Sequence, residues 1–314
     1  MSTEGSTRAV VAALLANTGI ALTKFVAFLL TGASSMLAEA IHSVADSGNQ
    51  ALLLLGGRQA RKRPTAAHPF GYGRERYIYA FIVSIVLFSV GGLFALYEAY
   101  HKAHELHATD GIPGDSLLTS RWWWVPIVVL LAAIVMESLS FRTAIREAGH
   151  VRGDASYLQF IRRAKQPELP VILLEDFAAL VGLVFALLGV GLSLLTQNLW
   201  FDVAGTALIG LLLVAVAVVL AVETKSLLLG ESASVEAEGR IAEALSATGG
   251  IDRIIHLKTM HLGPDELLVA AKVAVPRDAS ATEIATAIDA AESSIRTVEP
   301  IARVIYLEPD IFRG

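Results

Sequence analysis

The sequence predicts a membrane all-α six-helix bundle followed by a small cytoplasmic α+β domain with the element order α-β-β-α-β. Two properties of the composition indicate the membrane part: 54% of the 314 residues are hydrophobic and only 18% are charged. A change of pattern after Val222, where long apolar stretches give way to short amphipathic ones, indicates the second part. We therefore expect residues 1–228 to form the membrane domain and residues 229–314 to form the C-terminal domain.

Six stretches of the chain are long and apolar enough to cross a bilayer. A helix needs about 20 apolar residues to span about 30 Å of hydrocarbon. The stretches are Ala9 to Thr31, Met36 to Gly57, Tyr77 to Tyr100, Trp122 to Phe141, Pro170 to Leu195 and Trp200 to Val222. The first one resembles a secretory signal, but it lacks a convincing cleavage site and leads directly into the second, so we expect it to be retained.

Basic residues are concentrated in two of the connecting segments. The segment between the third and fourth stretches contains only Lys102 and Arg121. The two basic segments contain Arg58, Arg61, Lys62, Arg63, Arg74 and Arg76, and Arg142, Arg146, Arg152, Arg162, Arg163 and Lys165. Because cytoplasmic loops collect Lys and Arg, we expect both basic segments and both termini to be cytoplasmic, in a multi-pass protein of the plasma (inner) membrane.

The C-terminal region shows alternating helix and strand patterns. Turn residues Gly263, Pro264 and Asp265 separate the first two strand-like runs. The expected elements are a helix from Ser234 to Ser246, strands from Ile251 to Leu262 and from Glu266 to Val275, a helix from Ser280 to Val298, and a strand from Ala302 to Leu307. A domain of about 80 residues is small enough to gain stability by pairing with a copy of itself, so we expect a homodimer.

The second apolar stretch contains the most informative residues of the chain, His42, Asp46 and Asn49. Their spacing of i, i+4 and i+7 places them on one side of a helix, as a polar stripe on an apolar cylinder. Ionisable residues inside a bilayer cost about 2.5–3.5 kcal/mol each on insertion scales and usually have a function there. The pattern therefore predicts a metal or proton site.

The fifth stretch supplies a partner for this stripe, the adjacent acids Glu175 and Asp176. The chain contains no cysteine, which leaves imidazole and carboxylate as the strong ligands. This donor set suits Zn²⁺ best and also accepts Co²⁺, Fe²⁺, Cd²⁺ or Mn²⁺. Two facing helices would combine His42, Asp46 and Glu175, with water, Asn49 or Asp176 completing a tetrahedron. Successive helical residues point about 100° apart, so Asp176 is the second choice.

The same residues also have structural interpretations. His42 and Asp46 can pair with each other and lock two helices together, and Asn49 is equally suited to an interhelical hydrogen bond. Glu175 and Asp176 can belong to the polar core of a bundle.

Four other acids lie within or near the apolar stretches. Asp202 and Glu223 lie near the ends, where headgroups are wet, so a structural role is expected for them. Glu98 and Glu137 lie deeper, but no residue of a ligand type neighbours them in the sequence, and their role stays open.

Two motifs make the chain resemble a known family. They are HSVAD, from His42 to Asp46, and AHPFGYGRERY, from Ala67 to Tyr77, and they occur together with six spans and a terminal α-β-β-α-β domain. With these features the chain resembles the cation diffusion facilitator family of divalent metal exporters, of the zinc-transporter type. The resemblance covers nearly the whole chain. It implies a homodimer in which residues 1–228 transport Zn²⁺ in exchange for protons and residues 229–314 dimerise.

The resemblance also shows where this chain departs from the family. Glu175 stands where the fifth helix often has histidine, and Ala179 stands where it often has aspartate, which resembles the branch with a Glu-Asp pair in that helix. An oxygen-rich site shifts preference toward Mn²⁺ or Fe²⁺.

Auxiliary metal sites of the family are depleted in this sequence. Tyr72 replaces a common histidine near His68, which is therefore expected to cap or pack. Ala271 and Tyr306 replace histidines of the C-terminal domain, where His261 and a symmetry mate are the remaining candidates. A separate group, His101, His104 and His107, lies on one side of the third span if that helix extends so far, and is suited either to metal release or to a solvated surface.

The function that follows is divalent metal export by alternating access, with protons competing for the same ligands. The alternative is a membrane-anchored metal sensor or partner-binding protein in which the residues of the second span are structural. No nucleophile, phosphate loop or HExxH pattern supports an enzyme. The expected partners are the metal ion, protons, the lipid bilayer and a second copy of the chain, and no nucleic acid.

Overall fold

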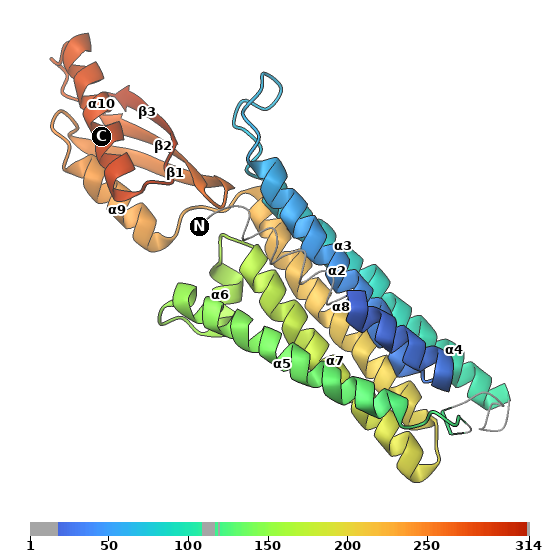
Figure 1. The fold of residues 1–314 in the computed structure, drawn as a ribbon. Helices are drawn as coiled ribbons and strands as arrows, with labels where there is room; N and C mark the ends of the chain where they lie inside the picture. The colour runs from blue at the N-terminus through green and yellow to red at the C-terminus, as the bar shows by residue number, and fades with distance from the viewer. Residues whose placement is uncertain (1–17, 109–116, 119, 313–314) are drawn as a thin grey trace. The chain divides into compact units, whose positions relative to one another are not determined.

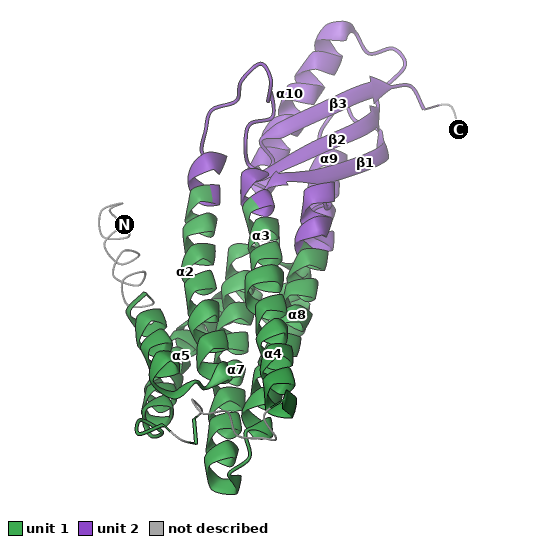
Figure 2. Cartoon of the chain, turned by 90° about the vertical axis from the view of Figure 1, so that its right-hand side faces the viewer, with its two compact units in different colours: residues 1–55, 79–223 green, residues 56–78, 224–314 purple. Residues whose placement is uncertain are grey.

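The computed structural model describes residues 18–108, 117–118 and 120–312, and the chain forms two compact units (Figure 1, Figure 2). The first unit comprises residues 1–55 and 79–223, and the second comprises residues 56–78 and 224–314. Residues 9–17 of the predicted first span lie outside the described part. The boundary expected after residue 228 stays a prediction, and the second unit also contains the segment 56–78, which lies far away in the sequence.

The first unit consists of long helices that lie side by side (Figure 1). An apolar helix, Thr18–Thr31, comes first among the described residues. The others are α2 (Ser34–Ala60), α3 (Glu75–Val86), η1 (Leu87–Leu93), α4 (Phe94–Ala108), α5 (Val125–Arg152), α6 (Tyr157–Arg163), α7 (Glu168–Thr196) and α8 (Trp200–Leu229).

The long apolar helices make the chain a multi-pass membrane protein. Within the described residues, four helical segments are long and apolar enough to cross a bilayer: Glu75–Ala108, Val125–Arg152, Glu168–Thr196 and Trp200–Leu229. The predicted number of six is not confirmed. The helix Thr18–Thr31 is short in its described part, and α2, although 27 residues long, carries a row of polar side chains.

Helices α7 and α8 approach each other closely at two glycines. A Cβ atom on Gly189 would lie 3.0 Å from the carbonyl oxygen of Phe201, and one on Gly205 would lie 2.9 Å from that of Phe185. Small residues permit such contacts between membrane helices, where van der Waals packing replaces the hydrophobic effect. The contact fixes the position of α7, the helix that carries Glu175.

The third predicted span is interrupted by a π-helix, η1, between α3 and α4. Gly91 and Gly92 lie in this wider turn, and both are buried. A Cβ atom on Gly92 would lie 2.7 Å from a methyl carbon of Val214 in α8. π-Helical turns are rare and are frequent at functional sites. The prediction of one span from Tyr77 to Tyr100 therefore missed a local irregularity.

The start of α2 is held by an acid from another helix. Asp202 of α8 accepts a hydrogen bond from the backbone N–H of Ser34 at 2.8 Å, and its other oxygen accepts one from the hydroxyl group of Ser35. The first N–H groups of a helix lack intrahelical partners and favour negative charge. Asp202 was expected near wet headgroups, but it is buried. Its structural role is to cap the start of α2.

The second unit contains the predicted α-β-β-α-β elements. Its three-stranded sheet has the order β1-β2-β3, with β2 antiparallel to β1 and parallel to β3. The elements are α9 (Val235–Ser246), β1 (Arg253–Gly263), β2 (Glu266–Ala274), α10 (Ala281–Val298) and β3 (Val304–Asp310). Alternate residues of β2 pack with buried residues of α9 and α10, such as Ile241 and Ile295. The expected order is confirmed, and most element boundaries agree within one or two residues.

Residues of the AHPFGYGRERY segment contact the turn between β1 and β2 within the same unit. The guanidinium group of Arg76 lies 2.7 Å from a carboxylate oxygen of Asp265. A Cβ atom on Gly73 would lie 2.9 Å from the carbonyl oxygen of Leu262 and 3.2 Å from the Cα atom of Gly263. Glycine at position 73 is therefore required by the close approach of two backbones.

The α7–α8 contact can be tested by adding one methyl group. We expect Gly189→Ala to lower the stability of the protein by about 1–3 kcal/mol, as in other overpacked sites, because its Cβ atom would overlap the backbone of α8. The measurement is thermal unfolding of the purified protein in detergent. Gly191→Ala is the control, because a Cβ atom at this position of the same helix meets no atom within 4 Å. Equal unfolding midpoints for the two variants would contradict the assigned contact.

Candidate functional site

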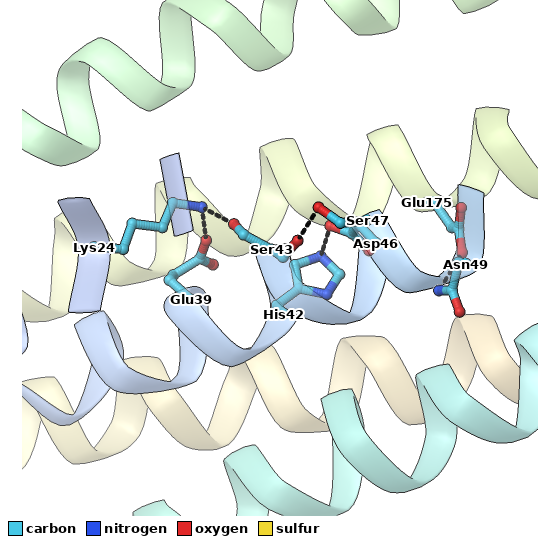
Figure 3. Close-up of polar contacts among 8 residues, drawn as sticks. All are labelled: Lys24, Glu39, His42, Ser43, Asp46, Ser47, Asn49 and Glu175. Carbon is cyan, nitrogen blue, oxygen red and sulfur yellow. Dashed lines mark hydrogen bonds and ion pairs between the residues drawn. The ribbon is translucent and has the colours of Figure 1, made fainter. Parts of the chain in front are cut away.

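Four polar residues of α2 lie on one side of the helix, and we call them the α2 stripe: Glu39, His42, Asp46 and Asn49 (Figure 3). The spacing of the last three predicted that they share a face. Glu39 was missed, although it lies three residues before His42 and extends the same face by one turn. Glu39, His42 and Asn49 are at most 1% exposed. Lys24 of the helix Thr18–Thr31, also missed, contacts Glu39.

Several polar atoms of the α2 stripe have no hydrogen-bond partner within the described part of the chain. They are both ring nitrogens of His42, Oε1 of Glu39, Oδ1 of Asp46 and Oδ1 of Asn49. The closest approach between ligand-type side chains of α2 is 3.5 Å, between Nε2 of His42 and Oδ2 of Asp46. Buried polar groups normally have partners, so the stripe has unused capacity to bind a cation or protons.

The side chain of Asn49 links α2 to α7. Its amide nitrogen donates a hydrogen bond of 2.7 Å to Oε1 of Glu175, which is 5% exposed. Of the two roles considered for Asn49, the structure shows the interhelical hydrogen bond. The bond directs Glu175 toward the α2 stripe.

The neighbouring acid, Asp176, points to another helix. The hydroxyl group of Ser140 in α5 donates a hydrogen bond of 2.9 Å to Oδ2 of Asp176. The two adjacent acids thus face α2 and α5, respectively, as the expected angle between successive helical residues requires.

A cavity of about 90 Å³ lies among the helix Thr18–Thr31, α2, α5 and α7. It is large enough for several water molecules or a partly hydrated ion. Its lining consists of Ile20, Asp46, Gln50, Met136, Glu137, Ser140, Ile172, Glu175, Asp176 and Ala179. The carboxylic acids in this lining come from three helices, α2, α5 and α7.

Glu137 is the cavity residue whose role the sequence left open. It lies on α5, three residues before Ser140, and it lines the cavity with Asp46, Glu175 and Asp176. The signal available in the sequence was an acid near the middle of an apolar helix. The sequence alone does not show that Glu137 lies near the other acids, because this depends on the packing of α5 against α7.

Carboxylates that line the same small cavity repel one another unless cations or protons neutralise them. The described residues contain no group of three or more His, Cys, Asp or Glu side chains positioned to hold a metal ion. His42 faces Asp46, whereas Glu175 is engaged with Asn49. The set His42, Asp46 and Glu175 therefore stays a prediction, and forming it requires that the carboxylate of Glu175 and the side chains of His42 and Asp46 come closer together.

Five of the other histidines lie beside an aromatic ring or a backbone carbonyl group. His68 lies beside Tyr72, with ring centroids 4.7 Å apart, and His261 is 3% exposed with Nδ1 3.3 Å from the carbonyl oxygen of Gly263. Helix α4 extends to Ala108, so His101, His104 and His107 do lie on it. Their rings are within about 5–6 Å of Tyr97, Tyr100 and Trp200, respectively.

Long apolar helices around an acidic cavity are features of membrane transport proteins for cations. The chain belongs to the cation diffusion facilitator family, because the family model of the cation efflux transmembrane domain matches residues 10–229.

Its relatives include animal proteins named as zinc antiporters and a plant protein named as a metal tolerance protein. The chain is 30% identical over 276 residues to the mitochondrial proton-coupled zinc antiporter SLC30A9 of Xenopus laevis, covering 87% of this chain and 47% of that protein. It is 31% identical over 255 residues to the human SLC30A9, covering 80% and 42%. It is 27% identical over 270 residues to metal tolerance protein C4 of Arabidopsis thaliana, covering 85% and 57%. The chain thus spans about half the length of these relatives.

The hydrogen bond between Asn49 and Glu175 can be measured with a double-mutant cycle of Asn49→Leu and Glu175→Leu, because leucine in either position removes the donor or the acceptor. We expect a coupling free energy of about 0.6–1.7 kcal/mol, the range found for polar contacts between membrane helices. Unfolding of the four proteins in detergent gives this value. Strictly additive effects of the two substitutions would show that the two side chains are not bonded in the folded protein.

Proposed function

We propose that the protein exports a divalent metal ion, most readily Zn²⁺, and takes up protons in return. The observation that carries the proposal is the cavity in the membrane unit, where Asp46, Glu137, Glu175 and Asp176 gather next to His42. Membership of a cation efflux family and relatives named as a proton-coupled zinc antiporter and a metal tolerance protein support it.

The ligands that we propose for the ion are His42 and Asp46 from α2 and Glu175 from α7. Water, Asp176 or Asn49 would complete a four-coordinate site, which is the geometry that Zn²⁺ prefers. One imidazole and several carboxylates also accept Co²⁺, Cd²⁺, Fe²⁺ and Mn²⁺, and the number of oxygen ligands favours the last two more than a site with two histidines would.

Competition for the ligands supplies the coupling to protons. A metal ion binds only to deprotonated imidazole and carboxylate groups, so its affinity falls where protons are abundant. Metal entering from the side of low proton concentration would bind in the cavity. Protons entering from the other side would displace it after access has alternated.

The orientation of the protein follows from its basic loops. Because Lys and Arg collect on the cytoplasmic side, we infer that the segments after α2 and α5, the termini and the C-terminal domain share the side from which metal is taken. A plasma membrane stays a prediction from this charge bias, and the SLC30A9 relatives, which carry mitochondrial names, give it no support. We also propose that the C-terminal domain pairs with that of a second copy.

The second candidate function is that of a membrane-anchored metal sensor. It is favoured by the hydrogen bond of 2.7 Å between Asn49 and Glu175, which gives these two residues of α2 and α7 a structural contact between helices. In a sensor, the hydrogen bond between Asn49 and Glu175 would persist and no flux would occur.

The transport function is tested in liposomes that contain a zinc-sensitive dye and carry a pH gradient. We expect zinc flux that depends on the gradient in the wild type and falls to the level of empty liposomes in Asp46→Ala, because the site loses a charged ligand. Ser47→Ala is the control, since this neighbour on α2 uses its hydroxyl group only for the carbonyl oxygen of Ser43. A folded wild type without flux of zinc, cobalt, iron or manganese would favour the sensor, and wild-type flux in Asp46→Ala would exclude the proposed site.

The contribution of α5 is tested with Glu137→Gln, which keeps the shape of the side chain and removes its charge. We expect zinc flux to fall by about 10–100-fold, the loss typical of residues that support metal ligands. Glu98→Gln is the matched control, because Glu98 also lies half-buried in a membrane helix but does not line the cavity. Equal fluxes of the two variants would show that Glu137 is not part of the transport site.

A further inference from the structure

A buried ion pair lies one helical turn from His42 in the membrane unit. The Nζ atom of Lys24 lies 3.0 Å from Oε2 of Glu39 and donates a hydrogen bond of 2.8 Å to the hydroxyl oxygen of Ser43 (Figure 3). The side chains of Lys24 and Glu39 are only 2% and 0% exposed. The pair connects the helix Thr18–Thr31 with α2.

Stability alone gives a weak reason for such a pair. Taking two charges out of water costs several kcal/mol per ion, and replacing a buried pair by apolar side chains is often neutral or stabilising. Ionisable residues in membrane segments therefore indicate a function, with the partner as part of it.

The position of the pair relates it to the path of the ion. Glu39 precedes His42 by three residues, which is about 4.5 Å along a helix at 1.5 Å per residue. Asp46 and Gln50, on the other side of His42, line the cavity, whereas Lys24 and Glu39 do not. The pair thus lies between His42 and the start of α2, away from the basic segment that follows α2.

The carboxyl group of Glu39 has a second oxygen that is not used. Oε1 has no hydrogen-bond partner among the described residues, although Glu39 is fully buried. It lies against α7, where a Cβ atom on Gly182 would come within 2.9 Å of it. Gly182 follows Glu175 by seven residues and so lies on the same side of α7. Glycine at this position leaves space beside an open carboxylate oxygen.

We propose that Glu39 is a further binding carboxylate for the transported cation, on the exit side of His42, and that Lys24 is a tethered cation that occupies it until the ion arrives. The proposal rests on the transport function proposed above. Lysine suits this role because its ammonium group is a compact charge on a flexible four-carbon chain. The hydroxyl group of Ser43 remains as an acceptor for the ammonium group when Glu39 binds the ion.

The exchange keeps the carboxylate paired with a positive charge at each stage. An unpaired carboxylate in a dry site is strongly unfavourable, so the arriving cation and Lys24 would replace each other instead of leaving Glu39 empty. In the absence of the ion, Lys24 would keep this carboxylate occupied.

The test compares full-length Lys24→Met, Glu39→Gln and the double variant Lys24→Met/Glu39→Gln in the liposome assay, with thermal unfolding in detergent measured on the same samples. The double variant has no unpaired charge, so we expect its unfolding midpoint to return to within a few degrees of the wild type. We expect its maximal zinc flux to stay about tenfold or more below the wild type, as for other residues that support a metal site. A stable double variant with wild-type flux would show that the pair is only structural.

The single variants separate binding from release. In Lys24→Met, the open carboxylate is expected to retain zinc, so both the KM for zinc and the maximal flux fall. In Glu39→Gln, the maximal flux falls and KM does not decrease. An unchanged KM in Lys24→Met would contradict the role of a tethered cation.

A second variant keeps the proposal testable if the charge variants do not fold. Gly182→Ala leaves both charges in place but crowds Oε1 of Glu39, and we expect it to lower the maximal zinc flux several-fold relative to Gly191→Ala, where a Cβ atom has space. Equal fluxes would overturn the proposal. If zinc flux is lost in Asp46→Ala but unchanged in the double variant and in Gly182→Ala, this inference alone is overturned. If the folded wild type shows no flux, the transport function and this inference are overturned together.

Discussion

The membrane unit depends on one constraint: a polar group inside hydrocarbon must find its partner within the protein. Helix α2 carries polar side chains along one face, and other helices supply their partners at three levels. Asp202 caps its start, Lys24 pairs with Glu39, and Glu175 accepts a hydrogen bond from Asn49. Apolar contacts alone would not select this rotation of α2, because lipid tails are as apolar as the neighbouring helices. The polar contacts therefore fix which face of α2 meets α7.

Close backbone contacts then determine how near the polar groups come to one another. Glycines place α7 against α8 at Gly189 and leave space for Glu39 at Gly182, so a single helix face is both a packing surface and a wall of the site. The π-helical turn η1 brings Gly91 beside His42, since a Cβ atom there would lie 3.9 Å from Nδ1. Irregular backbone and unpaired polar atoms both occur around His42. Such departures from an optimally stable bundle are expected where function requires them.

The sequence predicted those features that depend on local periodicity. The shared face of His42, Asp46 and Asn49 follows from helix geometry, and the α-β-β-α-β order follows from patterns within short segments. The facing of the second and fifth stretches was expected, but the particular contacts of their side chains were not predictable. Glu137 joins the acids only through the packing of α5 against α7, and the choice between the two roles of Asn49 depends on the position of Glu175. The π-helix was missed because hydropathy averages over a whole span. Lys24 and Glu39 were visible as charges in apolar stretches, but only the structure pairs them.

The two polar contacts at the ends of the α2 stripe have a property that suits alternating access. The bond between Asn49 and Glu175 lies on the side of Asp46, and the bond between Lys24 and Glu39 lies on the other side of His42. A hydrogen bond between membrane helices, such as that of Asn49 with Glu175, contributes about 0.6 kcal/mol on average, which is small compared with the differential affinity that a bound ion can have for two conformations. The buried ion pair of Lys24 with Glu39 costs more to break and needs a cation that replaces Lys24. Successive stripe residues are three or four positions apart, or about 4.5–6 Å at 1.5 Å per residue. On the proposed transport function, a partly dehydrated cation that moves along α2 would therefore pass from one residue of the stripe to the next, and it would replace Lys24 when it reaches Glu39.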